Sequence, residues 1–257
     1  LARSAPVFAL AASLGGAALG GMPFDFFLIE AFQENYDLRE VYVWDINDEG
    51  TAVGTSTNLP SYGGYLWTAD AGKTLIPITW PRGVNNHNVV VGGSIVLDFE
   101  TGEQTFMPVP AGAVRAPQAQ AINDNGFVVG YAETCQCSNS NQVQQLAFYW
   151  SASGGMHTVP VIGAKELLRI NQNNVAIGNI RPSAGASRGF VFDINTGASI
   201  NLSELLPPVS GGLPFSMATN INDDGVVCGE GYNGVTSAAF VWSEADGFTF
   251  LPGLLGG

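Results

Sequence analysis

The residues with the clearest chemical potential lie in one short segment, DINDEG, from Asp45 to Gly50. Asp45, Asn47 and Glu49 place side-chain oxygens at alternate positions ahead of a glycine, the arrangement of the first half of a calcium loop. These three residues are therefore candidate metal ligands, with calcium as the metal. The later bidentate acid of an EF-hand loop is missing, so a plain tight turn is the competing interpretation.

Four further segments repeat part of this pattern and favour the turn. Each has Ile or Val followed by an asparagine: Asn47, Asn85, Asn123, Asn171 and Asn222. Three residues later each has glycine or asparagine: Gly50, Asn88, Gly126, Asn174 and Gly225. These two residue types adopt a left-handed backbone most readily, and an asparagine side chain can cap a hairpin. The acids are not shared, because Gly83, Ala121 and Arg169 stand where the first segment has Asp45.

The sequence offers no coherent catalytic set, and we expect no enzyme activity. His87 and His157 fall in different segments near predicted turns, and neither a nucleophile elbow nor a phosphate-binding loop is present. Asp45, Asp124 and Asp223 stand at the ends of predicted inner strands, so a glycosidase with paired carboxylates is the enzymatic alternative.

The five asparagine turns belong to five repeats of the whole chain segment. Seven residues after each asparagine comes a glycine, in the series Gly54, Gly92, Gly130, Gly178 and Gly229. A strand-like aromatic or apolar run then ends at Trp67, Leu97, Trp150, Phe192 or Trp242, and five residues later comes another glycine. Each repeat reads as four short strands, which predicts an all-β chain and a β-propeller of four-stranded antiparallel blades.

We expect five full repeats plus an extra strand over residues 25–32. A six-bladed ring and a sandwich or solenoid of the same hairpins are the alternatives. Trp67, Trp150 and Trp242 keep the register of the repeats and are expected in the core. Trp44 and Trp80 fall outside that register, which makes them candidates for contact with a ligand or a partner.

The first 22 residues differ from the rest of the chain. One basic residue precedes a long uncharged run rich in Ala, Leu and Gly. This pattern is typical of a signal peptide, and the run also approaches the roughly 20 residues that span a bilayer. We therefore expect residues 1–22 to be a signal peptide or a membrane anchor, and residues 23–257 to be a single repeat domain.

The formal net charge of −13, with only nine Lys and Arg, argues against a nucleic-acid partner. Cys135 and Cys137 lie in a polar segment and are expected to be loop thiols. Cys228 occupies a position where other repeats have Val or Ile, so we expect it to be a small buried residue.

The segments AINDNGFVVGYAE…LAFYW (from Ala121) and NINDDGVVCGEG…AAFVW (from Asn220) resemble the bacterial HAF-type extracellular repeat. The resemblance covers roughly residues 40 to 257, but the histidine of the family's His-Ala-Phe triplet is absent from every unit. It implies a secreted or cell-surface protein and a repeat fold, without a specific activity.

Together these observations predict an extracytoplasmic, acidic propeller protein that acts as a non-catalytic binding or assembly module. Its expected partner is a protein or a second copy of itself, with carbohydrate as a further candidate ligand. Membrane contact is expected only through the N-terminal segment. The alternatives are a membrane-anchored accessory subunit of a larger complex and a glycosidase or carbohydrate-binding propeller.

Overall fold

The computed structural model describes residues 41–56, 63–134, 144–180, 187–206, 215–232 and 236–251. The predicted N-terminal segment (residues 1–22), the extra strand (residues 25–32), Cys135 and Cys137 lie outside these ranges.

The described chain forms five units of four antiparallel strands, each built from consecutive strands. The first unit contains β1 (Val41–Ile46), β2 (Ala52–Ser56), β3 (Gly63–Thr68) and β4 (Gly72–Ile76). The second contains β5 (Gly83–Val84), β6 (Val89–Gly92), β7 (Ile95–Asp98) and β8 (Gln104–Phe106). The third contains β9 (Gln118–Ile122), β10 (Val128–Glu133), β11 (Gln145–Ser151) and β12 (Gly155–Thr158).

The fourth unit contains β13 (Ala164–Ile170), β14 (Val175–Ile180), β15 (Arg188–Asp193) and β16 (Ser199–Asn201). A short 3-10 helix, η2 (Leu202–Leu205), follows it. The fifth contains β17 (Ser216–Ile221), β18 (Val227–Tyr232), β19 (Ser237–Ser243) and β20 (Gly247–Phe250). A single parallel pair, Arg188 with Ser216, links the sheets of the fourth and fifth units.

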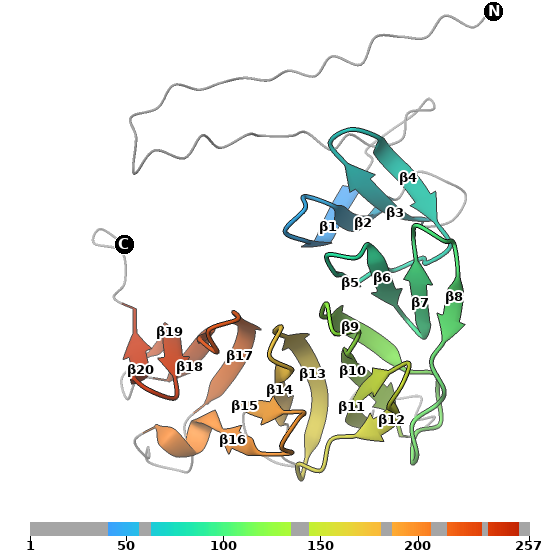
Figure 1. Cartoon of the computed structure of the whole chain (residues 1–257). Coiled ribbons are helices and arrows are strands. Elements are labelled where there is room, and N and C mark those ends of the chain that lie inside the picture. The colour runs from blue at the N-terminus through green and yellow to red at the C-terminus, as the bar shows by residue number, and fades with distance from the viewer. Residues whose placement is uncertain are drawn as a thin grey trace, which may run out of the picture.

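The five units stand side by side in an arc, with the first and the fifth at its two ends (Figure 1). The first strand of each unit, β1, β5, β9, β13 and β17, lies toward the inner side of the arc. The hydrophobic core consists of four clusters, each formed by residues from two neighbouring units. The chain is therefore an all-β propeller of four-stranded antiparallel units, as the repeats predict.

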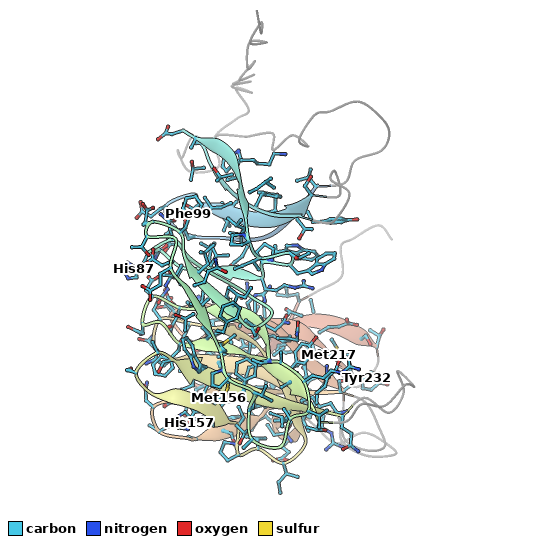
Figure 2. The ribbon with its side chains drawn as sticks, turned by 90° about the vertical axis from the view of Figure 1, so that its right-hand side faces the viewer. His87, Phe99, Met156, His157, Met217 and Tyr232 are labelled. Atoms are coloured by element: carbon cyan, nitrogen blue, oxygen red, sulfur yellow. The ribbon has the colours of Figure 1, made fainter. Side chains whose placement is uncertain are left out.

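The two rims of the arc carry different connections. Figure 2 shows the arc from its side, with His87 in the turn between β5 and β6 at one rim. Met217 and Tyr232, at the start of β17 and the end of β18, lie toward the opposite rim. We call the first the asparagine rim, because the five asparagine turns lie between the first and second strands of their units.

A bulge in the inner strand explains the glycine seven residues after each asparagine. In β1 the pairing with β2 shifts between Val43 and Asp45, which leaves Trp44 as the extra residue, and β9, β13 and β17 contain equivalent shifts. A carbonyl oxygen of the inner strand lies against the glycine: Tyr42 at Gly54, for example, and Gln118 at Gly130. A Cβ at either glycine would overlap this oxygen, so only glycine fits.

The turn asparagines form a continuous ladder of hydrogen bonds along the asparagine rim. Each Oδ1 accepts the backbone N–H four residues later, which closes its own hairpin. Each Nδ2 in the first four units donates to the carbonyl oxygen of the asparagine in the next unit. These bonds run from Asn47 to Asn85 (2.8 Å), to Asn123 (3.1 Å), to Asn171 (2.9 Å) and to Asn222 (3.0 Å).

A second ladder uses the residue that follows each asparagine. Its backbone N–H donates to a side-chain oxygen of the corresponding residue in the next unit: Asp48 to Asn86, Asn86 to Asp124, Asp124 to Gln172 and Gln172 to Asp223. The turns also have the expected backbone, since Gly50, Asn88, Gly126, Asn174 and Gly225 all have positive φ. Each turn therefore closes its own hairpin and also connects two units.

The expectation that Cys228 is buried is wrong. Its four counterparts, Val53, Val91, Val129 and Ile177, are fully buried in the clusters between their own unit and the next. Cys228 is exposed, with a free thiol. It belongs to the fifth unit, and no sixth unit follows in the described part of the chain, so the same strand position faces outward.

Two substitutions of Asn123 should lower the free energy of unfolding by different amounts. Asn123→Asp keeps the oxygen that closes the hairpin but removes the donor to the Asn171 carbonyl. We expect a loss of about 1–3 kcal/mol, because the Asn171 carbonyl and Asn174 Oδ1 each lose a donor, although the carbonyl keeps the Asn174 N–H, and a larger loss of about 2–4 kcal/mol for Asn123→Ala. The free energy of unfolding in urea measures both.

The control is Asn222, which is exposed and whose side-chain oxygen accepts the Val226 N–H and so closes its own hairpin. Asn222→Asp should therefore change stability by less than about 0.5 kcal/mol. Equal losses for Asn123→Asp and Asn222→Asp would contradict an inter-unit role for the asparagine.

Candidate functional site

The inner strands place one residue of each unit at an equivalent position, three residues before the turn asparagine. These residues are Trp44, Arg82, Gln120, Leu168 and Thr219. In the first unit this residue is the extra residue of the bulge, and bulges commonly redirect a side chain next to a binding site. The repeat therefore fixes the backbone here while the side chain varies from unit to unit.

Trp44 and Arg82 bring neighbouring units into direct contact at this position. The guanidinium carbon of Arg82 lies 4.3 Å from the ring centroid of Trp44, a cation–π contact. The Trp44 ring is fixed by a hydrogen bond from Nε1 to Thr55 Oγ1 (2.9 Å) and by stacking on Tyr42, with ring centroids 5.7 Å apart. The arginine is thus held over a rigid aromatic surface.

A recess of about 250 Å³ opens beside Arg82, between the second and third units. Its lining combines two aromatic residues, Trp80 and Tyr131, with Arg82, Gln118 and Gln120. Gly93 and Ala119 complete the lining, and their backbones are paired through the bond from Ala119 N–H to Gly93 O (2.9 Å). We call this lining, together with Trp44, the inner-wall site.

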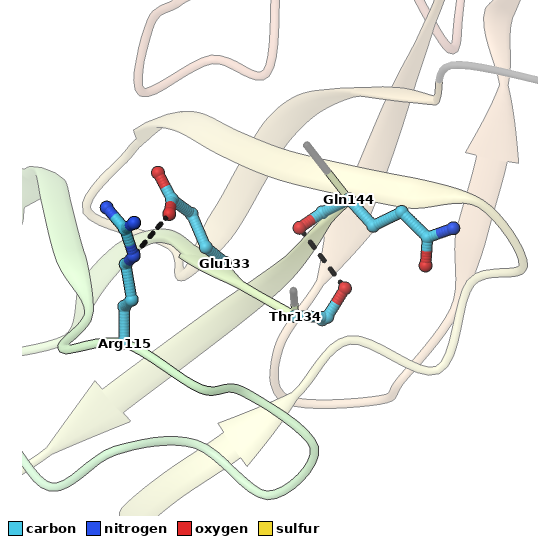
Figure 3. Close-up of polar contacts among 4 residues, drawn as sticks. All are labelled: Arg115, Glu133, Thr134 and Gln144. Carbon is cyan, nitrogen blue, oxygen red and sulfur yellow. Dashed lines mark hydrogen bonds and ion pairs between the residues drawn. The ribbon is translucent and has the colours of Figure 1, made fainter. Parts of the chain in front are cut away.

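Charged residues of both signs act on the hydroxyl of Tyr131. Burial raises the pKa of its hydroxyl, Glu166 raises it further, Arg82 lowers it and Glu133 raises it. Glu133 forms an ion pair with Arg115, with 3.1 Å between Nε and Oε2 (Figure 3). At the end of β10, Thr134 also donates to the carbonyl oxygen of Gln144, as the same figure shows.

The candidate metal ligands have other contacts. Asp45 Oδ2 accepts the backbone N–H of Val84 in the second unit (3.0 Å). The Oδ1 of Asn47 closes its hairpin, and its Nδ2 donates to Asn85. Glu49 is exposed in the same turn. Within the described ranges, no three His, Cys, Asp or Glu side chains form a group that could hold a metal ion.

The structure brings together two of the residues singled out in the sequence and adds others. Trp44 and Trp80 both lie beside Arg82. Arg82, Gln118, Gln120 and Tyr131 were not predicted, because nothing in their spacing marks them. The signal that could have found Arg82 is its alignment with Trp44, at the same position of consecutive repeats. Of the tryptophans predicted in the core, Trp150 and Trp242 are buried and Trp67 is half-buried.

In the part of the chain that the structure describes, no helix is long and apolar enough to cross a membrane.

Comparison with known proteins identifies the fold alone. No family model matches the chain, and no curated protein matches its sequence. The structure is similar to the crystal structure of TolB from Acinetobacter baumannii, with a TM-score of 0.53 at 12% identity over 84% of this chain. This chain spans 55% of the length of that protein. A more distant likeness, with a TM-score of 0.37 at 9% identity, is to the β-propeller domain of the Trilobed protease from Pyrococcus furiosus, covering 83% of each chain.

Asp45 should make the stability of the protein fall as pH rises above the usual aspartate range. Burial raises the pKa of Asp45 above its ordinary value of 3.8, against the lowering effects of the Val84 N–H, Arg169 and the Ile46 N–H. The folded state therefore binds this proton more tightly than the unfolded state, so the stabilisation is complete below pH 3.8 and is lost as pH rises through the folded pKa.

Asp45→Asn keeps an oxygen for the Val84 N–H and removes the titration. Relative to this variant, the wild type should be less stable at pH 7 than at pH 3, as measured by urea unfolding across that range. Asp48→Asn, an exposed neighbour in the same turn, serves as the control. A difference between wild type and Asp45→Asn that does not vary with pH would contradict the raised pKa.

Proposed function

We propose that this propeller is an extracytoplasmic, non-catalytic binding module whose ligand or partner contacts the inner-wall site. The observation that carries the proposal is the Trp44–Arg82 pair beside the recess. Tryptophan and arginine are among the residue types that contribute most to binding energy at interfaces. Trp44 and Arg82 are half-buried, and Trp80 keeps 42% of its surface exposed. The repeat does not need them there, since other units have Gln, Leu or Thr.

The non-catalytic part of the proposal is supported by what the candidate carboxylates do. Asp124 and Asp223 accept backbone N–H groups of the neighbouring unit in the second ladder. Asp45 accepts the N–H of Val84. All three acids therefore have structural partners, whereas a glycosidase needs a pair of carboxylates free to face the sugar.

The extracytoplasmic location is proposed from the sequence. The signal-like residues 1–22 and the resemblance to the HAF-type extracellular repeat support it, together with the low lysine and arginine content. The alternative, a membrane-anchored accessory subunit of a larger membrane complex, shares this location and differs in that the first 22 residues remain attached and the protein belongs to that complex.

Trp80→Ala should greatly weaken binding of the ligand or partner at the inner-wall site without unfolding the protein. The full chain is purified from its own source cells under native conditions, and the species that copurify with it are measured by mass spectrometry. We expect at least a tenfold loss of the bound species in Trp80→Ala, because a large exposed aromatic contact is removed.

Phe106→Ala is the matched control, since Phe106 is also an exposed aromatic residue, 66% exposed on the outer strand β8. It should retain the bound species. Equal retention by both variants would place the contact elsewhere and reject the inner-wall site. A hydrolytic activity on glycans that is lost in Asp45→Asn would reject the non-catalytic proposal.

An assembly role has its own supporting observation, the open face of the fifth unit. Cys228 pairs across the sheet with Val241, which pairs with Thr249, so the three side chains share one face. In each earlier unit the equivalent face packs against the next unit. At the other end of the arc Ile46 is 61% exposed, whereas three of its four counterparts, Val84, Ile122 and Ile221, are at most 9% exposed and the fourth, Ile170, is half-buried. We propose that a partner or a second copy covers the open face of the fifth unit.

Cys228 provides a direct probe of that face, in a background where Cys135 and Cys137 are serine. The purified monomer should react with a maleimide at the rate of a free thiol. In the native assembly Cys228 should become protected at least tenfold. Val129→Cys in a Cys228→Ala background, at the equivalent buried position, should stay unreactive until the protein unfolds. A Cys228 thiol that reacts equally fast in monomer and native assembly would reject this contact.

A further inference from the structure

The inner-wall site has the composition of a receptor for a carboxylate attached to a ring. Arg82 supplies the charge. The protein has a net charge of −13 with only nine Lys and Arg, yet among the described residues no carboxylate lies within ion-pair distance of Arg82. Its neighbour is instead the Trp44 ring. An arginine stacked on one face keeps its N–H edges available, and these match the two oxygens of a carboxylate.

The rest of the recess matches a sugar ring. Trp80 and Tyr131 offer flat apolar surfaces, on which the C–H face of a pyranose can lie. Gln118 and Gln120 both donate and accept hydrogen bonds, as ring hydroxyls require. A recess of about 250 Å³ accommodates about one sugar residue, with the rest of a chain running along the inner side of the arc.

We propose that the inner-wall site binds an acidic sugar, a hexuronate residue within an oligosaccharide, with its carboxylate on Arg82. This inference rests on the proposed binding function and names the ligand of the same site. The ring packs on Trp80, its hydroxyls bond to Gln118 and Gln120, and Trp44 holds the guanidinium in place. A neutral sugar offers Arg82 only uncharged oxygens, without the charge-assisted pair of hydrogen bonds that a carboxylate makes.

We expect Glu166, which does not line the recess, to weaken this binding. It lies on β13 and its charge acts on Tyr131 in the direction opposite to Arg82. An anionic ligand beside Tyr131 is therefore repelled by Glu166 as well as attracted by Arg82. Glu133, which also faces Tyr131 electrostatically, is already paired with Arg115 and repels the ligand less.

The test is calorimetric titration of the full chain with oligogalacturonate and with a neutral glucose oligomer of the same length. We expect the acidic oligomer to bind at least tenfold more tightly. Arg82→Gln should abolish that difference, Arg82→Lys should restore part of it, and Glu166→Gln should tighten binding of the acidic oligomer severalfold. Urea unfolding of each variant shows whether it remains folded.

Equal affinity for the acidic and the neutral oligomer would overturn the inference, as would an unchanged affinity in folded Arg82→Gln. A sulfated oligomer that binds more tightly than the uronate would also overturn it, since the site would then select a tetrahedral anion. The two proposals can fail independently. If a native partner is lost in Trp80→Ala but no uronate binds, the proposed binding function stands and only the acidic-sugar inference is rejected.

Discussion

The hydrogen bond from one turn asparagine to the carbonyl oxygen of the next is the interaction on which this structure depends. The four hydrophobic clusters hold neighbouring units together, but apolar contact alone leaves two sheets free to slide and rotate. The asparagine bonds are directional and identical at each junction, so they fix the register between units. The position of every inner-strand residue relative to its neighbour follows from them, including the distance between Trp44 and Arg82.

The bulge in the inner strand links this scaffold to function. In the first, third, fourth and fifth units it allows one residue to leave the regular pairing of the sheet, and the glycine opposite makes room for the displaced backbone. The second unit has no such bulge, but its glycine, Gly92, also lies against a carbonyl, that of Trp80. The side chain three residues before the turn asparagine differs in every unit, so the repeat does not require a particular one there. The chain places tryptophan, arginine and glutamine there in its first three units, and the inner-wall site results from that local freedom.

The features that depend on interactions within one unit could be predicted from the sequence, and those that depend on contacts between units could not. The turns and strands were predictable because the interactions that form them are local. Asn47 accepts the N–H of Thr51 in its own hairpin, and Gly50 adopts the positive φ that the turn requires. The partner of Asn47 was not predictable, since the bond to Asn85 depends on how two units pack. Cys228 was wrongly expected in the core because its sequence position is equivalent to Val129, while burial requires a neighbouring unit. Trp44 and Trp80 were singled out because they lie outside the register of the other tryptophans. Arg82 was missed, although it stands three residues before its turn asparagine, as Trp44 does.

The two ladders also have a consequence for how such chains change in evolution. Donor and acceptor lie on the same turn, so a whole unit can be duplicated between any two others and both new junctions find their hydrogen bonds. The acceptors of the second ladder can be different residue types, because the hydrogen bond requires only a side-chain oxygen; here they are Asn86, Asp124, Gln172 and Asp223. At the asparagine rim any unit can therefore follow any other. Proteins built this way can change the number of units and the side chains of the inner wall independently.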